Sequence, residues 1–243
     1  MVNRITPADA IRVSTQLLET IDDVSANRWD AAKARAAALS GDLRPDKVEA
    51  LSRQFSRELS AAGAAVGATA ATPAIGTFTT LAATFAELAW FTGRAGDLVL
   101  TIAALHGRDD PTVEERRGWV LAVLIYGSSA RDGFARAVNE ATSGLGVTAD
   151  GRLPASTLQL ANRLMASTFA RRYGTRRGLA ALGRFIPVGI GAAVGGATNY
   201  FAIRHLATSA DQFFARLPYS AIEVESRDVT GRAIGRRSRA SRP

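Results

Sequence analysis

The stretch Phe78–Gly107, FTTLAATFAELAWFTGRAGDLVLTIAALHG, decides the fold class of this 243-residue chain. It is apolar apart from a few charged side chains, and its apolar residues show no alternation of period two. Pro73 and Gly76 precede it and Gly107 ends it, which are common signals at helix boundaries. A run of this length with these boundaries predicts one long, largely apolar helix.

Outward from this segment, the same signals predict further helices. Thr6-Pro7 is typical of a helix start, and apolar stripes follow it and the later start near Pro45. The expected apolar stripes are Ala10, Val13, Leu17, Leu18 and Ile21 after Pro7, and Leu51, Phe55 and Leu59 after Pro45. The other expected helices are residues 28–40, a helix capped by Asp110-Pro111, residues 128–145, Pro154 to Tyr173, and a glycine-rich helix reaching about Leu217. The sequence therefore predicts an all-α, single bundle-like domain with glycine-rich apolar helices.

Composition narrows the function classes. The chain is 47% hydrophobic and 21% charged, as in a globular protein, with no cysteine and two histidines. Disulfides, thiolate metal sites and cysteine nucleophiles are excluded, as are most catalytic triads. We therefore expect no cofactor and no metal, and we assign no catalytic residue. The first residues carry charges every few positions without the apolar core of a signal peptide, so we expect a cytoplasmic protein.

Charge is unevenly distributed along the chain. Residues 1–110 hold 11 Lys/Arg and 13 Asp/Glu, whereas residues 111–243 hold 19 and 9. Arginines next to an apolar segment are expected at an anionic membrane surface; solvated helix ends are the alternative. The candidates are Arg171, Arg172, Arg176, Arg177 and Arg184. Tyr173 is the only aromatic residue among them and no recognition motif is evident, so we expect no nucleic acid partner.

Two segments are free of charge, residues 59–86 and 185–203, and the pentapeptide GAAVG occurs in both. Glycines spaced by four residues allow two helices to approach closely, in membranes and in soluble bundles. The candidates for close packing are Gly63, Gly67, Gly189, Gly191 and Gly195. The same GAAVGGAT stretch lacks the lysine of a phosphate-binding loop, which Ala197 replaces, so it predicts no nucleotide site. The open alternatives are internal packing, partial insertion into a membrane and a permanent span, for which the many Ala, Gly and Thr residues are poorly suited.

Polar residues embedded in the apolar helices form a second candidate site. They are Glu87, Arg94, Asp97, Asn199 and Arg204. Arg94 and Asp97 are neighbours at i, i+3 on a helix, and a buried charge needs a partner. Either these residues form an internal ion-pair set, or they line a polar spot that binds a ligand head group or transfers protons.

These residues also carry a resemblance. The segment FAELAWFTGRAGDLVLTIAALHGRDDPTVEERR and the later IPVGIGAAVGGATNYFAIRHLATSADQFF resemble the EcsC protein family of bacteria, over about Leu43 to Leu217. The matching positions are Glu87, Arg94, Ile102, Ala103, Gly107, Asp109, Pro187, Gly189, Gly191, Asn199 and Arg204; His106 stands where the family has tyrosine. The resemblance implies an all-helical protein, often linked with membranes and in some bacteria encoded beside an ABC transporter, and no established activity. It divides the chain into a helical extension (1–42), the EcsC-like domain (43–217) and a basic tail (218–243), which we expect to be disordered.

Together these observations predict a cytoplasmic protein peripheral to the inner face of a bacterial membrane. Its partner would be lipid or a membrane-protein complex, contacted by the glycine-rich helices and the flanking arginines. One alternative is a soluble scaffold that self-associates into a homo-oligomer through the same helices. The other is an enzyme that acts on a lipid-like substrate at Glu87, Arg94 and Asp97.

Overall fold

The apolar segment Phe78–Gly107 supplies nearly all of the helix around which the protein is built. The computed structural model describes residues 7–70, 77–142, 153–173 and 192–217, which fold as helices without a strand. The helices are α1 (Pro7–Asn27), α2 (Trp29–Ala38), α3 (Arg44–Ala70), α4 (Thr77–Leu105), α5 (Val113–Tyr126), α6 (Ala130–Thr142), α7 (Ala155–Tyr173) and α9 (Ala192–Arg216), with a 3-10 turn, η1 (Gly127–Ser129), before α6. The predicted all-α fold is confirmed.

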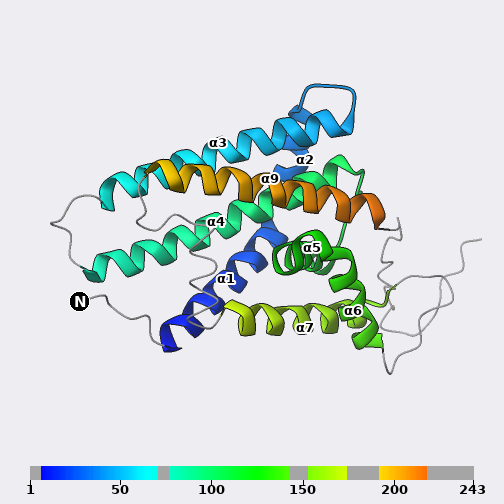
Figure 1. Cartoon of the computed structure of the whole chain (residues 1–243). Coiled ribbons are helices and arrows are strands. Elements are labelled where there is room, and N and C mark those ends of the chain that lie inside the picture. The colour runs from blue at the N-terminus through cyan, green and yellow to red at the C-terminus, as the bar shows by residue number, and fades with distance from the viewer. Residues whose placement is uncertain (1–6, 71–76, 143–152, 174–191, 218–243) are drawn as a thin grey trace, which may run out of the picture.

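The second half of α4 is the central helix of the core. Every residue from Ala95 to Ala103 is buried, so the helix is covered on all sides, as expected for a helix that is apolar all round. It contacts α1, α2, α3, α5 and α9. Figure 1 shows α4 running behind α9 and below α3, with α1 crossing it from below.

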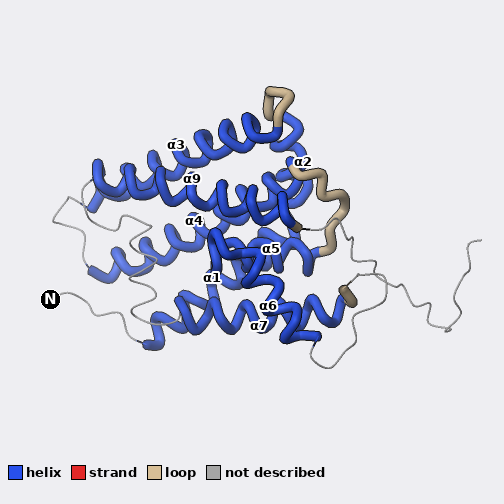
Figure 2. Tube along the Cα trace, turned by 45° about the vertical axis from the view of Figure 1, so that its right-hand side comes forward, coloured by secondary structure: helices blue, strands red, loops and turns tan. Residues whose placement is uncertain are grey.

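Helices α3 and α9 form the most extensive helix pair among the described elements. Ser56 donates a hydrogen bond to the Tyr200 carbonyl at 3.4 Å, and Arg204 binds Glu49 at 2.9 Å. Lower numbers on α3 thus face higher numbers on α9, so the two helices are antiparallel. Both views show them side by side (Figures 1 and 2). Helix α3, which carries the first GAAVG repeat, is therefore a neighbour of α9, which carries residues 192–195 of the second.

The predicted stripes lie in one shared core. Leu51, Phe55 and Leu59 of α3 are fully buried, as are Ala10, Val13, Leu17 and Ile21 of α1, whereas Leu18 is partly exposed. Segment 1–42, predicted as an extension, thus supplies α1 and α2 to the core around α4. The tail, 218–243, lies outside the described residues.

The start of α5 differs from the expectation. Its N-cap is Thr112, not Asp110-Pro111: the Thr112 hydroxyl accepts from the Glu115 amide, and the Glu115 carboxylate accepts from the Thr112 amide. This reciprocal capping box satisfies two amides at the helix start. Asp110 instead has a positive φ of 43° in the preceding turn.

One stretch of the described residues, Leu88–Leu105 in α4, is long and apolar enough to cross a membrane by length and composition. It differs from the two charge-free segments, and 67% of it is buried inside the fold. Its apolar character is explained by its place at the centre of the core.

Candidate functional site

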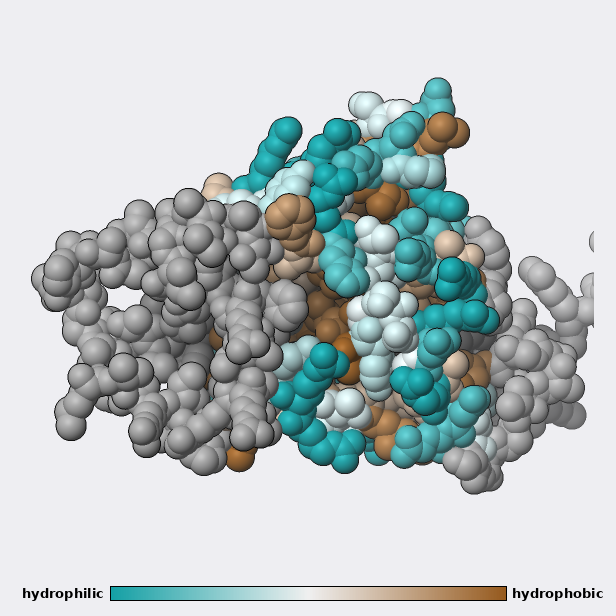
Figure 3. Space-filling view, viewed as in Figure 1, coloured by the Kyte–Doolittle hydropathy of each residue, from teal (hydrophilic) through white to brown (hydrophobic). Residues whose placement is uncertain are grey.

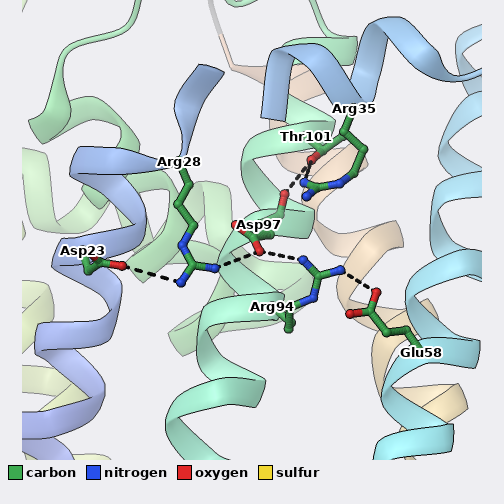
Figure 4. Close-up of polar contacts among 7 residues, drawn as sticks. All are labelled: Asp23, Arg28, Arg35, Glu58, Arg94, Asp97 and Thr101. Atoms are coloured by element: carbon green, nitrogen blue, oxygen red, sulfur yellow. Dashed lines mark hydrogen bonds and ion pairs between the residues drawn. The ribbon is translucent and has the colours of Figure 1, made fainter. Parts of the chain in front are cut away.

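The candidate site is a network of ion pairs centred on Asp97, in the middle of α4 (Figure 4). The Asp97 side chain is only 4% exposed, and its Oδ2 accepts from Arg94 at 2.8 Å and from Arg28 at 3.1 Å. A buried carboxylate is costly unless opposite charges and hydrogen bonds surround it. Two guanidiniums meet that need here.

Arg94 links α4 to α3. Its Nη1 donates to Asp97, its Nη2 donates to Glu58 of α3, and the guanidinium carbon lies 4.5 Å from the centre of the Phe55 ring. Burial alone would lower the pKa of Arg94, but the hydrogen bonds and charges of Glu58 and Asp97 outweigh burial and raise it. Arg94 therefore remains charged, and it fixes the spacing of the two helices.

Arg28 links the same carboxylate to the junction between α1 and α2. It donates to Asp97 and also lies 3.6 Å from Asp23 of α1. Nearby, Arg35 of α2 donates to the Thr101 hydroxyl, which in turn donates to the Asp97 carbonyl one turn earlier in α4. Asp97 and Thr101 thus bring α1, α2 and α3 together around α4.

The charges in this network are balanced. Figure 4 shows the carboxylates of Asp23, Glu58 and Asp97 alternating with the guanidiniums of Arg28 and Arg94, while Arg35 reaches Thr101. Both Asp97 and Arg94 are paired with each other and with further helices, which is the arrangement of a structural ion-pair set. This geometry supports a structural role, in which the ion pairs fix the positions of the helices relative to one another.

Only part of the predicted polar cluster meets at this site. Arg94 and Asp97 pair as their spacing predicts. Arg204 lies on α9, where it binds Glu49 of α3 and the Tyr200 hydroxyl instead. Glu87 and Asn199 lie on α4 and α9, but their side chains are outside what the structure describes.

The predicted packing glycines and arginines are described only in part. Gly63 and Gly67 lie on α3 and Gly195 lies on α9, whereas Gly189 and Gly191, like Arg176, Arg177 and Arg184, fall outside the described residues. Arg171 is exposed at the end of α7. Arg172 donates to the Ile125 carbonyl at 2.6 Å, so its guanidinium serves the end of α5.

The structure adds residues that the sequence did not indicate. Arg28 and Glu58 hold the network together from 69 and 36 residues away, and no local spacing pattern marks them. Close helix contact occurs at Gly96, where an added Cβ would lie 2.9 Å from Val24 of α1. Gly93 and Gly96 are spaced by three residues, so the four-residue glycine spacing that predicts close helix contact does not mark this position.

His106 predicts a pH dependence of stability. Its buried ring donates from Nε2 to Asp211 of α9 at 2.8 Å, with Arg44 and Arg108 nearby. Burial lowers the pKa of His106 by more than the hydrogen bond that the ring donates to Asp211 raises it. His106 therefore binds a proton less tightly in the folded protein than in the unfolded chain, where it becomes protonated below about pH 6.5.

The contribution of His106 to the free energy of unfolding should therefore be fully present above about pH 6.5. It should fall as the pH drops through that value, by at most about 1.4 kcal/mol per pH unit. Urea denaturation of the natural protein and of His106→Gln between about pH 7.5 and 5.5 measures this. The stability difference should shrink or reverse in favour of the variant at the lower pH. A difference that grows at low pH would contradict the prediction.

The fold and the site define a class: an all-α bundle whose central apolar helix is fixed by a buried ion-pair network. The model of the EcsC protein family matches residues 1–217. The chain belongs to this family. The match begins at residue 1, so it includes α1 and α2, which the resemblance read from the sequence left out. No curated protein and no solved structure matches the chain.

Proposed function

We propose that this EcsC-family protein docks at the inner face of a bacterial cytoplasmic membrane through one end of its helical bundle. We call it the charge-free end and define it as residues 59–70 of α3, 77–86 of α4 and 192–199 of α9. These residues carry no ionisable side chain. The activity is binding, to lipid or to a membrane complex, and no reaction is assigned.

One observation carries the proposal: the three charge-free helix segments gather at the same end of the bundle. Helix α3 ends where α4 and α9 begin, and both views place these three helix ends together, away from α5 and α6 (Figures 1 and 2). Residues far apart in the sequence thus combine into one uncharged end. Because large apolar patches at a protein surface mark protein or membrane interaction sites, an uncharged end formed by three helices supports membrane contact.

The described face in Figure 3 is largely hydrophilic. On the face seen in Figure 3, teal hydrophilic residues cover most of the described body, with brown residues between them. The basic C-terminal half supplies attraction to anionic lipid, which should weaken as salt screens it. A hydrophilic body with one uncharged end is the distribution of surface residues expected of a peripheral membrane protein.

The test is co-sedimentation with vesicles of phosphatidylethanolamine and phosphatidylglycerol. The natural protein should bind, and Leu81→Asp at the charge-free end should abolish binding because the new carboxylate opposes transfer from water. Leu160→Asp is the matched control, since Leu160 is an exposed leucine on the polar body, on α7. It should bind like the natural protein.

Circular dichroism should show the same helix content in both variants as in the natural protein. A loss of binding can then be assigned to the new charge and not to unfolding. Equal binding by the two variants would overturn docking through this end. Absence of vesicle binding by the natural protein, with a homo-oligomer that Leu81→Asp dissociates, would favour self-association through the same helices instead.

A further inference from the structure

We infer that the charge-free end enters only one leaflet of the bilayer, with Trp90 and the Arg94–Glu58 pair at the level of the lipid headgroups. This inference rests on the proposed function and names its partner, the acyl chains of one leaflet. It makes the protein monotopic, with both arms of the α3–α4 hairpin entering and leaving on the same side.

Helix length supplies the first argument. Beyond Glu58, α3 continues without charge to Ala70, and α4 is free of charge from Thr77 to Ala86. At about 1.5 Å per residue, each arm is roughly 15–18 Å long. The hydrocarbon core of a bilayer is about 30 Å thick, so each arm matches one leaflet and falls short of a span.

The polar boundary of the hairpin extends over about two turns of α4. Glu58 is the last charged residue of α3 before its uncharged arm and binds Arg94 of α4, while Glu87 is the first charged residue after the uncharged arm of α4. The side of the pair away from the charge-free end holds Asp97 and Arg28, so the network lies at the base of the hairpin. An ion-pair network at this point keeps the arms together and marks where the polar body begins.

An aromatic residue lies at the same boundary. Trp90 is 41% exposed, and it lies four residues before Arg94, on the same face of α4 and one turn nearer the charge-free end. Tryptophan is enriched at the level of the headgroups, where its ring contacts acyl chains and its N–H meets polar groups. An exposed tryptophan between an uncharged arm and an ion-pair network fits that level better than it fits water.

The chain offers a direct test, because its other two tryptophans, Trp29 and Trp119, are 5% and 4% exposed. Fluorescence is measured with vesicles of phosphatidylethanolamine and phosphatidylglycerol whose acyl chains are brominated near the headgroup or near the chain end. Trp90 should shift to the blue and be quenched more by bromine near the headgroup. Trp90→Phe should lose both the shift and the quenching.

A second probe reads the far end of the hairpin. Phe78→Trp in the Trp90→Phe background places a tryptophan at the start of α4. This probe should be quenched more by bromine near the chain end, at the middle of the bilayer. Stronger quenching near the headgroup would overturn the inference, because it would place residue 78 at a membrane surface, either on the far side of a span or without insertion.

The outcomes separate this inference from the proposed function. Vesicle binding that Leu81→Asp abolishes, without deep quenching of a tryptophan at position 78, would overturn one-leaflet insertion and leave docking intact. Absence of binding by the natural protein would overturn both. Binding with Trp90 quenched more by bromine near the chain end would place the boundary elsewhere and overturn the inference.

Discussion

Replacing Asp97 with alanine should lower the free energy of unfolding by about 3 kcal/mol, the lower end of the cost of breaking a buried ion pair. The carboxylate is 4% exposed and is shared by two guanidiniums. Arg94, at 16% exposed, loses a partner where water replaces it poorly, whereas Arg28, at 40%, can turn toward solvent. For a domain of this size, the midpoint of thermal unfolding should fall by roughly 6–12 °C.

Urea denaturation measures this change, and graded variants test its cause. Asp97→Asn keeps the size and an acceptor, so it should cost less than alanine. Glu58→Gln should cost less again, because Glu58 is 39% exposed and Arg94 keeps Asp97. If Asp97→Asn were as harmful as Asp97→Ala, the charge of the carboxylate alone, rather than its size and its acceptor atoms, would be responsible.

Asp30→Ala is the control for loss of an acidic residue. Asp30 is 93% exposed on α2, where it pairs with Lys33 on the surface. Its removal should leave the urea midpoint unchanged, because exposed ion pairs contribute little. An Asp97→Ala midpoint equal to that of Asp30→Ala would show that the buried network does not stabilise the fold.

The elements with local signals could be predicted from the sequence. Helix α3 ends at Ala70 and α4 begins at Thr77, so the two described helices lie on either side of the break that Pro73 and Gly76 predict. The stripe Leu51, Phe55 and Leu59 is buried because residues spaced by four lie on one helix face. The predicted cap of α5 at Asp110-Pro111 is wrong by two residues, because Thr112 with Glu115 forms the capping box and starts the helix.

The candidate site could be predicted only where its partners are close in sequence. The Arg94–Asp97 pair follows from i, i+3 spacing. The bonds to Arg28 and Glu58 depend on how α1 and α3 are placed against α4, which no pattern in a single helix specifies. For the same reason, the predicted association of Arg204 with Asp97 is wrong: Arg204 binds Glu49 of α3.

Close contacts at glycines also differ in whether the sequence predicts them. The repeated GAAVG predicts close packing of α3 and α9, whereas the close contact at Gly118 of α5 comes from a lone glycine with no spacing signal. An added Cβ there would lie 2.8 Å from Oδ1 of Asn162 and 3.0 Å from Cε2 of Phe134. Asn162 is fully buried on α7 and donates to the Glu114 carbonyl and carboxylate at 2.8 and 2.7 Å. Its amide therefore cannot turn away without breaking both bonds.

Gly118→Ala should consequently lower the free energy of unfolding by about 2 kcal/mol, the usual cost of forcing a methyl group into a packed core. Helix propensity alone predicts a gain of about 1 kcal/mol for the same substitution. Gly93→Ala on α4 is the matched control, because its Cβ would lie 3.5 Å from Thr20, an ordinary contact. Urea denaturation should therefore move the two midpoints in opposite directions, down for Gly118→Ala and up or unchanged for Gly93→Ala. Two variants of equal stability would mean that α5 and α7 can separate at no cost, and that the contact between Gly118 and Asn162 does not set their spacing.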